Sequence, residues 1–101
     1  MYIVSKMICD DNAQYHVQEK PVVFSDIDKA KAYCRSDFGK NFTKKNGYDI
    51  DEVAEKEEKS FFGSLDCETP VWFLTGYFKK IRSDERMSFV EYRLDEVTGQ
   101  Q

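Results

Sequence analysis

The sequence predicts a single α+β domain, in which an antiparallel sheet of about four strands, built as two hairpins, packs against one core-packing helix and one short acidic helix. Strand-like runs near both ends flank two helix-like segments in the middle of the chain. The length of 101 residues suffices for one hydrophobic core but not for two. Aromatic residues make up 15% of the chain, which excludes a disordered protein. We assign 1–97 to the domain and expect 98–101 to fray.

The first hairpin is predicted from the N-terminal residues. Tyr2–Cys9 is rich in β-branched and aromatic residues, and residues 10–13 have the composition of a turn. Gln14–Glu19 then alternates between apolar and polar residues, as a half-exposed strand does. Pro21 lacks a backbone N–H, so we expect the pairing to end near Lys20 or to continue only on an edge of the sheet.

The core-packing helix is predicted over Asp26–Phe38. Ser25 resembles an N-cap, because its hydroxyl can accept a hydrogen bond from an unpaired amide of the first turn. Gly39 stands where a left-handed C-terminal residue is commonest. The apolar stripe recurs at helical spacing and consists of Ile27, Ala30, Cys34 and Phe38.

A second helix is predicted over Asp49–Lys59, after a turn at Asn46-Gly47. The segment contains many good helix formers, and Glu52 with Lys56 has the i,i+4 spacing of a helical ion pair. Its apolar stripe is narrow, so we expect this helix to be mostly exposed.

The second hairpin is predicted from Val71–Ile81 and Met87–Leu94. A connection with an odd number of residues would set Phe78 opposite Val90 and Gly76 opposite Tyr92, so that apolar residues meet on one face. The side chains expected to pack under the first helix are Trp72, Leu74, Phe78, Val90, Tyr92 and Leu94.

The sequence gives little support to catalysis, so we expect a non-enzymatic protein with no catalytic residue, metal or cofactor. His16 is the only histidine, which excludes a multi-histidine metal site. The glycines occur singly, which excludes a phosphate-binding loop. We interpret Cys9, Cys34 and Cys67 as reduced core thiols, since no Cys-x-x-Cys pattern is present. No run resembles a signal peptide or a membrane span, so we expect a cytoplasmic protein that does not contact a membrane.

Charge is the strongest functional signal. The net charge is −4, and the segment 49–59 alone sums to −4, so the rest of the chain is balanced. We expect this segment to bind a protein partner, with adjacent aromatic side chains as anchors. The candidate binding residues are Asp49, Asp51, Glu52, Glu55, Glu57, Glu58, Phe61 and Phe62. Phe42 and Tyr48 are further aromatics that we expect to be exposed.

Carboxylates on a projecting element can imitate a phosphate backbone and occupy a basic surface meant for nucleic acid. In size and acidity the chain is similar to small phage or mobile-element inhibitors such as anti-CRISPR proteins, although no motif marks it as one. That likeness implies an inhibitor that acts by occupancy. The alternative is a small nucleic-acid-binding protein, whose binding residues would be Lys44, Lys45, Lys79, Lys80, Arg82 and Arg86. A homodimer formed through an edge strand is a third possibility.

Overall fold

The computed structural model describes residues 1–9, 16–18, 20–57, 68–80 and 88–97, with the backbone alone at 16–18, 68–70 and 80. This part of the chain contains six strands, one α-helix and one short 3₁₀ helix, so the predicted α+β class is confirmed. In chain order the elements are β1 (Tyr2–Cys9), β2 (His16–Gln18), β3 (Val22–Phe24), α1 (Ile27–Asn41), η1 (Lys44–Asn46), β4 (Tyr48–Glu57), β5 (Glu68–Lys80) and β6 (Ser88–Val97).

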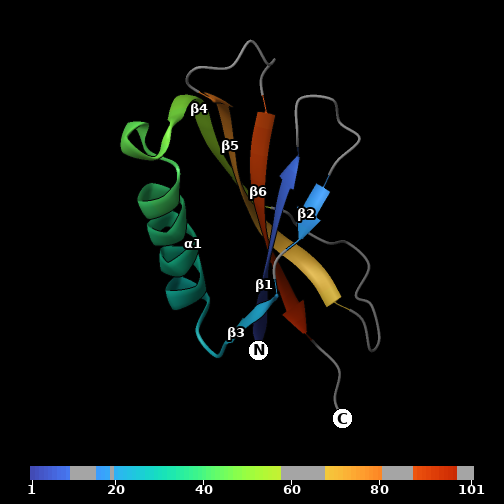
Figure 1. Cartoon of the computed structure of the whole chain (residues 1–101). Coiled ribbons are helices and arrows are strands. Elements are labelled where there is room, and N and C mark those ends of the chain that lie inside the picture. Colours follow the sequence, from blue (N-terminus) through green and yellow to red (C-terminus); the bar gives the residue numbers. More distant parts are fainter. Residues whose placement is uncertain (10–15, 19, 58–67, 81–87, 98–101) are drawn as a thin grey trace.

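The strands form one antiparallel sheet in the order β2-β1-β6-β5-β4, with β3 also paired to β1 (Figure 1). β2 pairs with the end of β1, where Cys9 lies opposite His16, and β3 pairs with its beginning, where Tyr2 lies opposite Phe24. The predicted first hairpin is therefore confirmed, while its turn at 10–13 lies outside the described residues. β2 and β3 share one edge of the sheet, and β4 forms the other.

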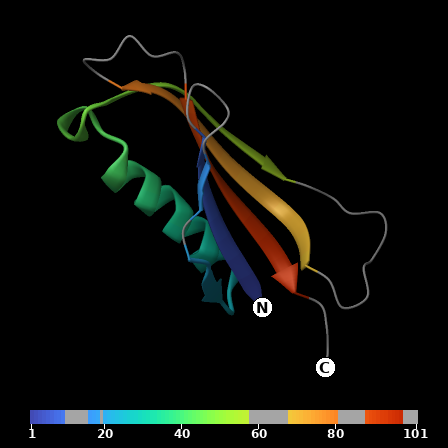
Figure 2. The same cartoon turned by 45° about the vertical axis from the view of Figure 1, so that its right-hand side comes forward.

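α1 packs against one face of this sheet, and the hydrophobic core lies between them (Figure 2). Ala30 and Cys34 of the helix are fully buried. Burial raises the pKa of the Cys34 thiol to about 12, with a further contribution from the charge of Asp37, so Cys34 is a core thiol rather than a nucleophile. All six strand residues that the sequence assigned to the core are buried beneath the helix: Trp72, Leu74, Phe78, Val90, Tyr92 and Leu94.

The ends of α1 differ from the prediction. Asp26, rather than Ser25, is the N-cap, and its Oδ1 accepts a 2.8 Å hydrogen bond from the backbone N–H of Asp28. The helix also continues through Gly39 to Asn41. The reason is Phe42, which extends the apolar stripe by four residues, is only 5% exposed and stacks on Phe38. Burying this ring outweighs the weak helix propensity of Gly39.

The predicted second helix is wrong, because its described residues, 49–57, belong to the edge strand β4. β4 pairs with β5 from Tyr48 opposite Lys80 to Glu57 opposite Trp72, with a bulge between Ile50 and Glu52. The bulge inserts one extra residue, so Ile50 and Val53 lie on the same face although they are three residues apart. A spacing of three is also the helical spacing, which explains why the pattern resembled a helix. The preceding turn is confirmed, since Gly47 adopts a left-handed conformation with a φ of 94°.

The β5–β6 pairing differs from the prediction by two residues. Gly76 lies opposite Val90, not Tyr92, and Phe78 lies opposite Ser88. A shift of two preserves which face each side chain occupies, so the predicted core is unaffected. The ring that covers Gly76 is Phe38 of α1: a β-carbon at this position would lie 2.6 Å from Phe38 Cζ.

A polar network crosses the interface between α1 and the sheet. Asp37 Oδ2 accepts hydrogen bonds of 2.6 Å from Tyr92 Oη and 2.9 Å from Lys6 Nζ. Lys6 Nζ also lies 5.5 Å from the centre of the Phe42 ring. Partial burial alone would raise the pKa of Asp37, but the two hydrogen bonds and the charge of Lys6 together outweigh it and hold that pKa below its usual value.

Gly76 provides a test of the helix–sheet contact. Gly76→Ala should destabilise the fold by about 1–3 kcal/mol, because the added methyl group overlaps the Phe38 ring. Gly39→Ala is the matched control and should stabilise it by about 0.5–1 kcal/mol, since no heavy atom lies within 4 Å of the added carbon in an exposed helix position. Urea unfolding measures both. Equal effects of the two substitutions would contradict the close approach of Phe38 to Gly76.

Asp37 predicts a pH dependence of stability. Because the folded-state pKa of Asp37 is depressed, its contribution is present above the unfolded-state pKa, which is near 3.8, and is lost as pH falls through the lower folded-state pKa. Asp37→Asn should cost about 1–3 kcal/mol at neutral pH and should flatten this acidic limb. Unfolding curves measured from pH 7 to strongly acidic pH test the expectation, and an unchanged limb in the variant would refute it.

Candidate partner-binding edge

The acidic residues predicted to bind a partner lie along β4, at the edge of the sheet. Residues 51–57 are all exposed, and among the described residues β4 pairs with β5 alone. Every second residue of such a strand directs its backbone N–H and C=O away from the sheet. β4 therefore presents unpaired main-chain groups and a row of carboxylates together.

Two of these carboxylates are neutralised by α1. Arg35 donates two hydrogen bonds of 2.8 Å to the two carboxylate oxygens of Glu55, and Lys31 Nζ lies 3.7 Å from Glu57 Oε1. The hydrogen bond from Arg35 holds the pKa of Glu55 below its usual value. Both basic side chains also lie over the ring of buried Trp72. Glu55 and Glu57 therefore contribute to the attachment of α1 to β4.

The remaining described acids of the segment differ from these two. No ion pair joins Asp49, Asp51 or Glu52 to a basic side chain within the described part of the chain. Asp51 stands at the bulge, and Glu52 lies opposite Tyr77 on β5. Glu58 lies outside the described residues. The acids that have no basic partner within the described chain thus lie at the beginning of β4.

The aromatic side chains expected to contact a partner lie partly outside the described residues. Phe61 and Phe62 lie outside the described residues. Phe42 and Tyr48, expected to be exposed, instead pack together with their ring centres 5.0 Å apart, and each also contacts Phe78. That expectation is wrong because the extension of α1 and the start of β4 bring both rings into the core.

The basic residues of the alternative interpretation come from two elements at one end of the sheet. Lys44 and Lys45 are exposed on η1, which directly precedes β4. Lys79 is exposed on β5 opposite Asp49, and the backbone of Lys80 lies opposite Tyr48. Arg82 and Arg86 lie outside the described residues. The structure thus brings two of the predicted basic clusters toward the same end, next to the acids of β4.

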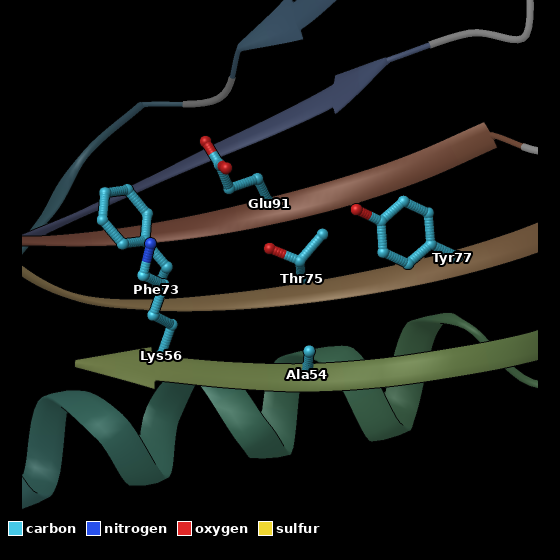
Figure 3. Close-up of a pocket in the computed structure, with 6 residues that line it drawn as sticks. All are labelled: Ala54, Lys56, Phe73, Thr75, Tyr77 and Glu91. Atoms are coloured by element: carbon cyan, nitrogen blue, oxygen red, sulfur yellow. The ribbon is translucent and has the colours of Figure 1, made fainter. Parts of the chain in front are cut away.

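A hollow on the sheet face away from α1 was not predicted. It has a volume of about 390 Å³ and lies over β4, β5 and β6 (Figure 3). The alternation along β5 could have indicated it, because Phe73, Thr75 and Tyr77 all fall on the face opposite the predicted core. The small Ala54 of β4 leaves the hollow open toward the sheet edge. Its lining residues are Ala54, Lys56, Phe73, Thr75, Tyr77 and Glu91.

The described residues offer little for metal or thiol chemistry. No group of three or more His, Cys, Asp or Glu side chains there could hold a metal ion. Cys9 and Cys34 are buried in the core, as expected, and Cys67 lies outside the described part. Within that part, no helix has both the length and the apolar character that crossing a membrane requires.

Comparison of the chain with family models, curated proteins and solved structures finds no match in any of the three. The candidate site therefore stands on its geometry and charge alone.

Charge reversal distinguishes the acids that pair with α1 from those that have no basic partner among the described residues. Glu55→Lys should lower the melting temperature, because it places a lysine against Arg35. Glu52→Lys should change the free energy of unfolding by less than about 0.5 kcal/mol, because Glu52 has no basic partner to lose within the described chain. Thermal unfolding monitored by circular dichroism compares them. A larger loss for Glu52→Lys would contradict the assignment of structural and available acids.

Proposed function

We propose that this protein is a non-enzymatic interaction module that binds a protein partner through the acidic edge strand β4. The observation that carries the proposal is the coincidence, on one strand, of carboxylates and a sheet edge that both lack a partner among the residues that the structure describes. Exposed charges steer the encounter with an oppositely charged partner more than they add to its affinity. The proposed partner therefore has a basic surface.

The rigidity of β4 supports this role. Glu55 and Glu57 pair with basic residues of α1 at the end of the strand, while its first residue, the half-buried Tyr48, packs against the buried ring of Phe42. A strand anchored at both ends presents Asp51 and Glu52 at fixed positions, so a partner need not order them on binding. A basic surface evolved for nucleic acid fits this charge pattern, and occupancy of such a surface would make the protein an inhibitor.

Binding of nucleic acid by the protein itself is the second candidate. The position of Lys44 and Lys45 next to Lys79 favours it, because phosphate contacts need clustered cations. Asp49 and Asp51 lie at the same end, however, and would repel phosphates. The acidic interpretation therefore has the stronger support.

Neutral variants of the unpaired acids test the proposal. Asp51→Asn with Glu52→Gln removes two negative charges at the edge. Ala32→Lys with Gly39→Lys makes the same change in net charge at exposed positions of α1. In affinity capture followed by mass spectrometry, a partner retained by the wild type should be retained by the α1 variant and released from the β4 variant. A competing oligonucleotide should displace that partner.

If the two double variants capture the partner equally, the acids of β4 do not bind it and the proposal is refuted. Direct binding of a single-stranded oligonucleotide to the wild type, weakening as salt rises and lost in Lys44→Glu with Lys45→Glu, would establish the second candidate in its place.

A further inference from the structure

We propose that β4 binds its partner by strand addition, in which an extended basic segment of the partner pairs with the free edge of β4 and inserts an apolar side chain into the hollow above Ala54. This inference rests on the proposed function and names the chemistry of the partner. It combines the edge of the sheet, the hollow that opens toward it and the charge of the strand.

The free edge supplies the main-chain part of the interface. β4 runs from Tyr48 to Glu57, and its outer edge has no paired strand among the described residues. Strand addition replaces the water on these N–H and C=O groups with the backbone of the partner. Main-chain hydrogen bonds of this kind provide affinity for any extended segment, whatever its sequence.

The hollow supplies the selection of side chains. On the face away from α1, Ala54 stands between Glu52 and Lys56 along β4, and Phe73, Thr75 and Tyr77 continue the floor on β5 (Figure 3). Side chains of an added strand would alternate across this face, so one of them would lie beside Ala54. The half-buried Phe73 ring and the exposed Tyr77 ring favour an apolar or aromatic side chain there.

Charge distinguishes two possible occupants of the free edge of β4, namely a second copy of β4 and a basic segment of another protein. A second copy of β4 would bring together two strands that each carry five acidic residues and one lysine, and their like net charge opposes this pairing. Glu52 and Ala54 lie on the same face of β4, so a strand with lysine or arginine two residues from its apolar side chain places the basic group beside Glu52. The acids of β4 thus disfavour pairing of this edge with itself and favour a basic partner.

A synthetic peptide about as long as β4 provides the probe. It has Val on one face, and on the other face it carries Phe at the centre and Lys at the positions beyond it toward the beginning of β4. We expect a fluorescently labelled peptide to bind the wild type at low ionic strength and to bind less tightly as salt rises. The same peptide with Glu in place of Lys should not bind. A third version, N-methylated at alternate backbone nitrogens, should also fail, because it keeps the charge but loses its hydrogen-bond donors.

Ala54→Phe fills the hollow and should weaken binding of the Lys peptide by about tenfold or more. Val23→Phe adds the same ring at an exposed position of β3, on the opposite edge of the sheet, and should leave binding unchanged. Circular dichroism of both variants confirms that the fold is intact.

Failure of the wild type to bind the peptide, or equal binding of the N-methylated peptide, would overturn strand addition. If Ala54→Phe binds the Lys peptide as tightly as the wild type does, no side chain of the peptide enters the hollow and that part of the proposal fails. A concentration-dependent dimer that forms through β4 would assign the edge to a second copy and also refute the proposal. If capture of a natural partner still depends on Asp51 and Glu52 but not on Ala54, the proposed function stands and strand addition fails. If capture depends on none of the three residues, both fail.

Discussion

The packing of α1 against a single face of the sheet is the constraint on which the other features depend. Phe38 reaches the sheet only because Gly76 has no side chain, and the Lys6–Asp37–Tyr92 network fixes the helix over the centre of the sheet. This contact buries the large side chains of β5 and β6 on one side. With a single α-helix in the described chain, it also leaves the opposite face and the β4 edge available for binding.

The acids of the segment 49–58 therefore have two different roles, although they are adjacent in sequence. Glu55 and Glu57 are paired with basic residues of α1, so they belong to the attachment of the edge strand. Asp51 and Glu52 have no such pairing within the described residues, and their charge is directed to solvent. A count of charges in the sequence treats these residues alike, whereas the fold distinguishes them by their distance from α1.

The sequence predicts the core well and the acidic segment poorly, for physical reasons. The stripe of α1 and the alternation of β5 and β6 are regular, and a register error of two residues leaves every side chain on its predicted face. β4 contains a bulge, which changes its spacing from two to three and makes Ile50 and Val53 look helical. Its strand conformation is fixed by pairing with β5, a non-local interaction that no local pattern reports. The alternation of β5 indicates the floor of the hollow, but its β4 side depends on this same non-local pairing, which the sequence does not reveal.

Residue-resolved amide hydrogen exchange along 48–57 tests the central claim most directly, because it reports both the strand and its free edge. In the free protein, protection should alternate from residue to residue along 52–57, beyond the bulge, since only the amides directed toward β5 are bonded. Addition of the basic peptide should slow exchange at the other set, which faces away from the sheet. Continuous protection over several consecutive amides in the free protein would contradict the edge strand, and an unprotected outer set at saturating peptide would contradict its role in binding.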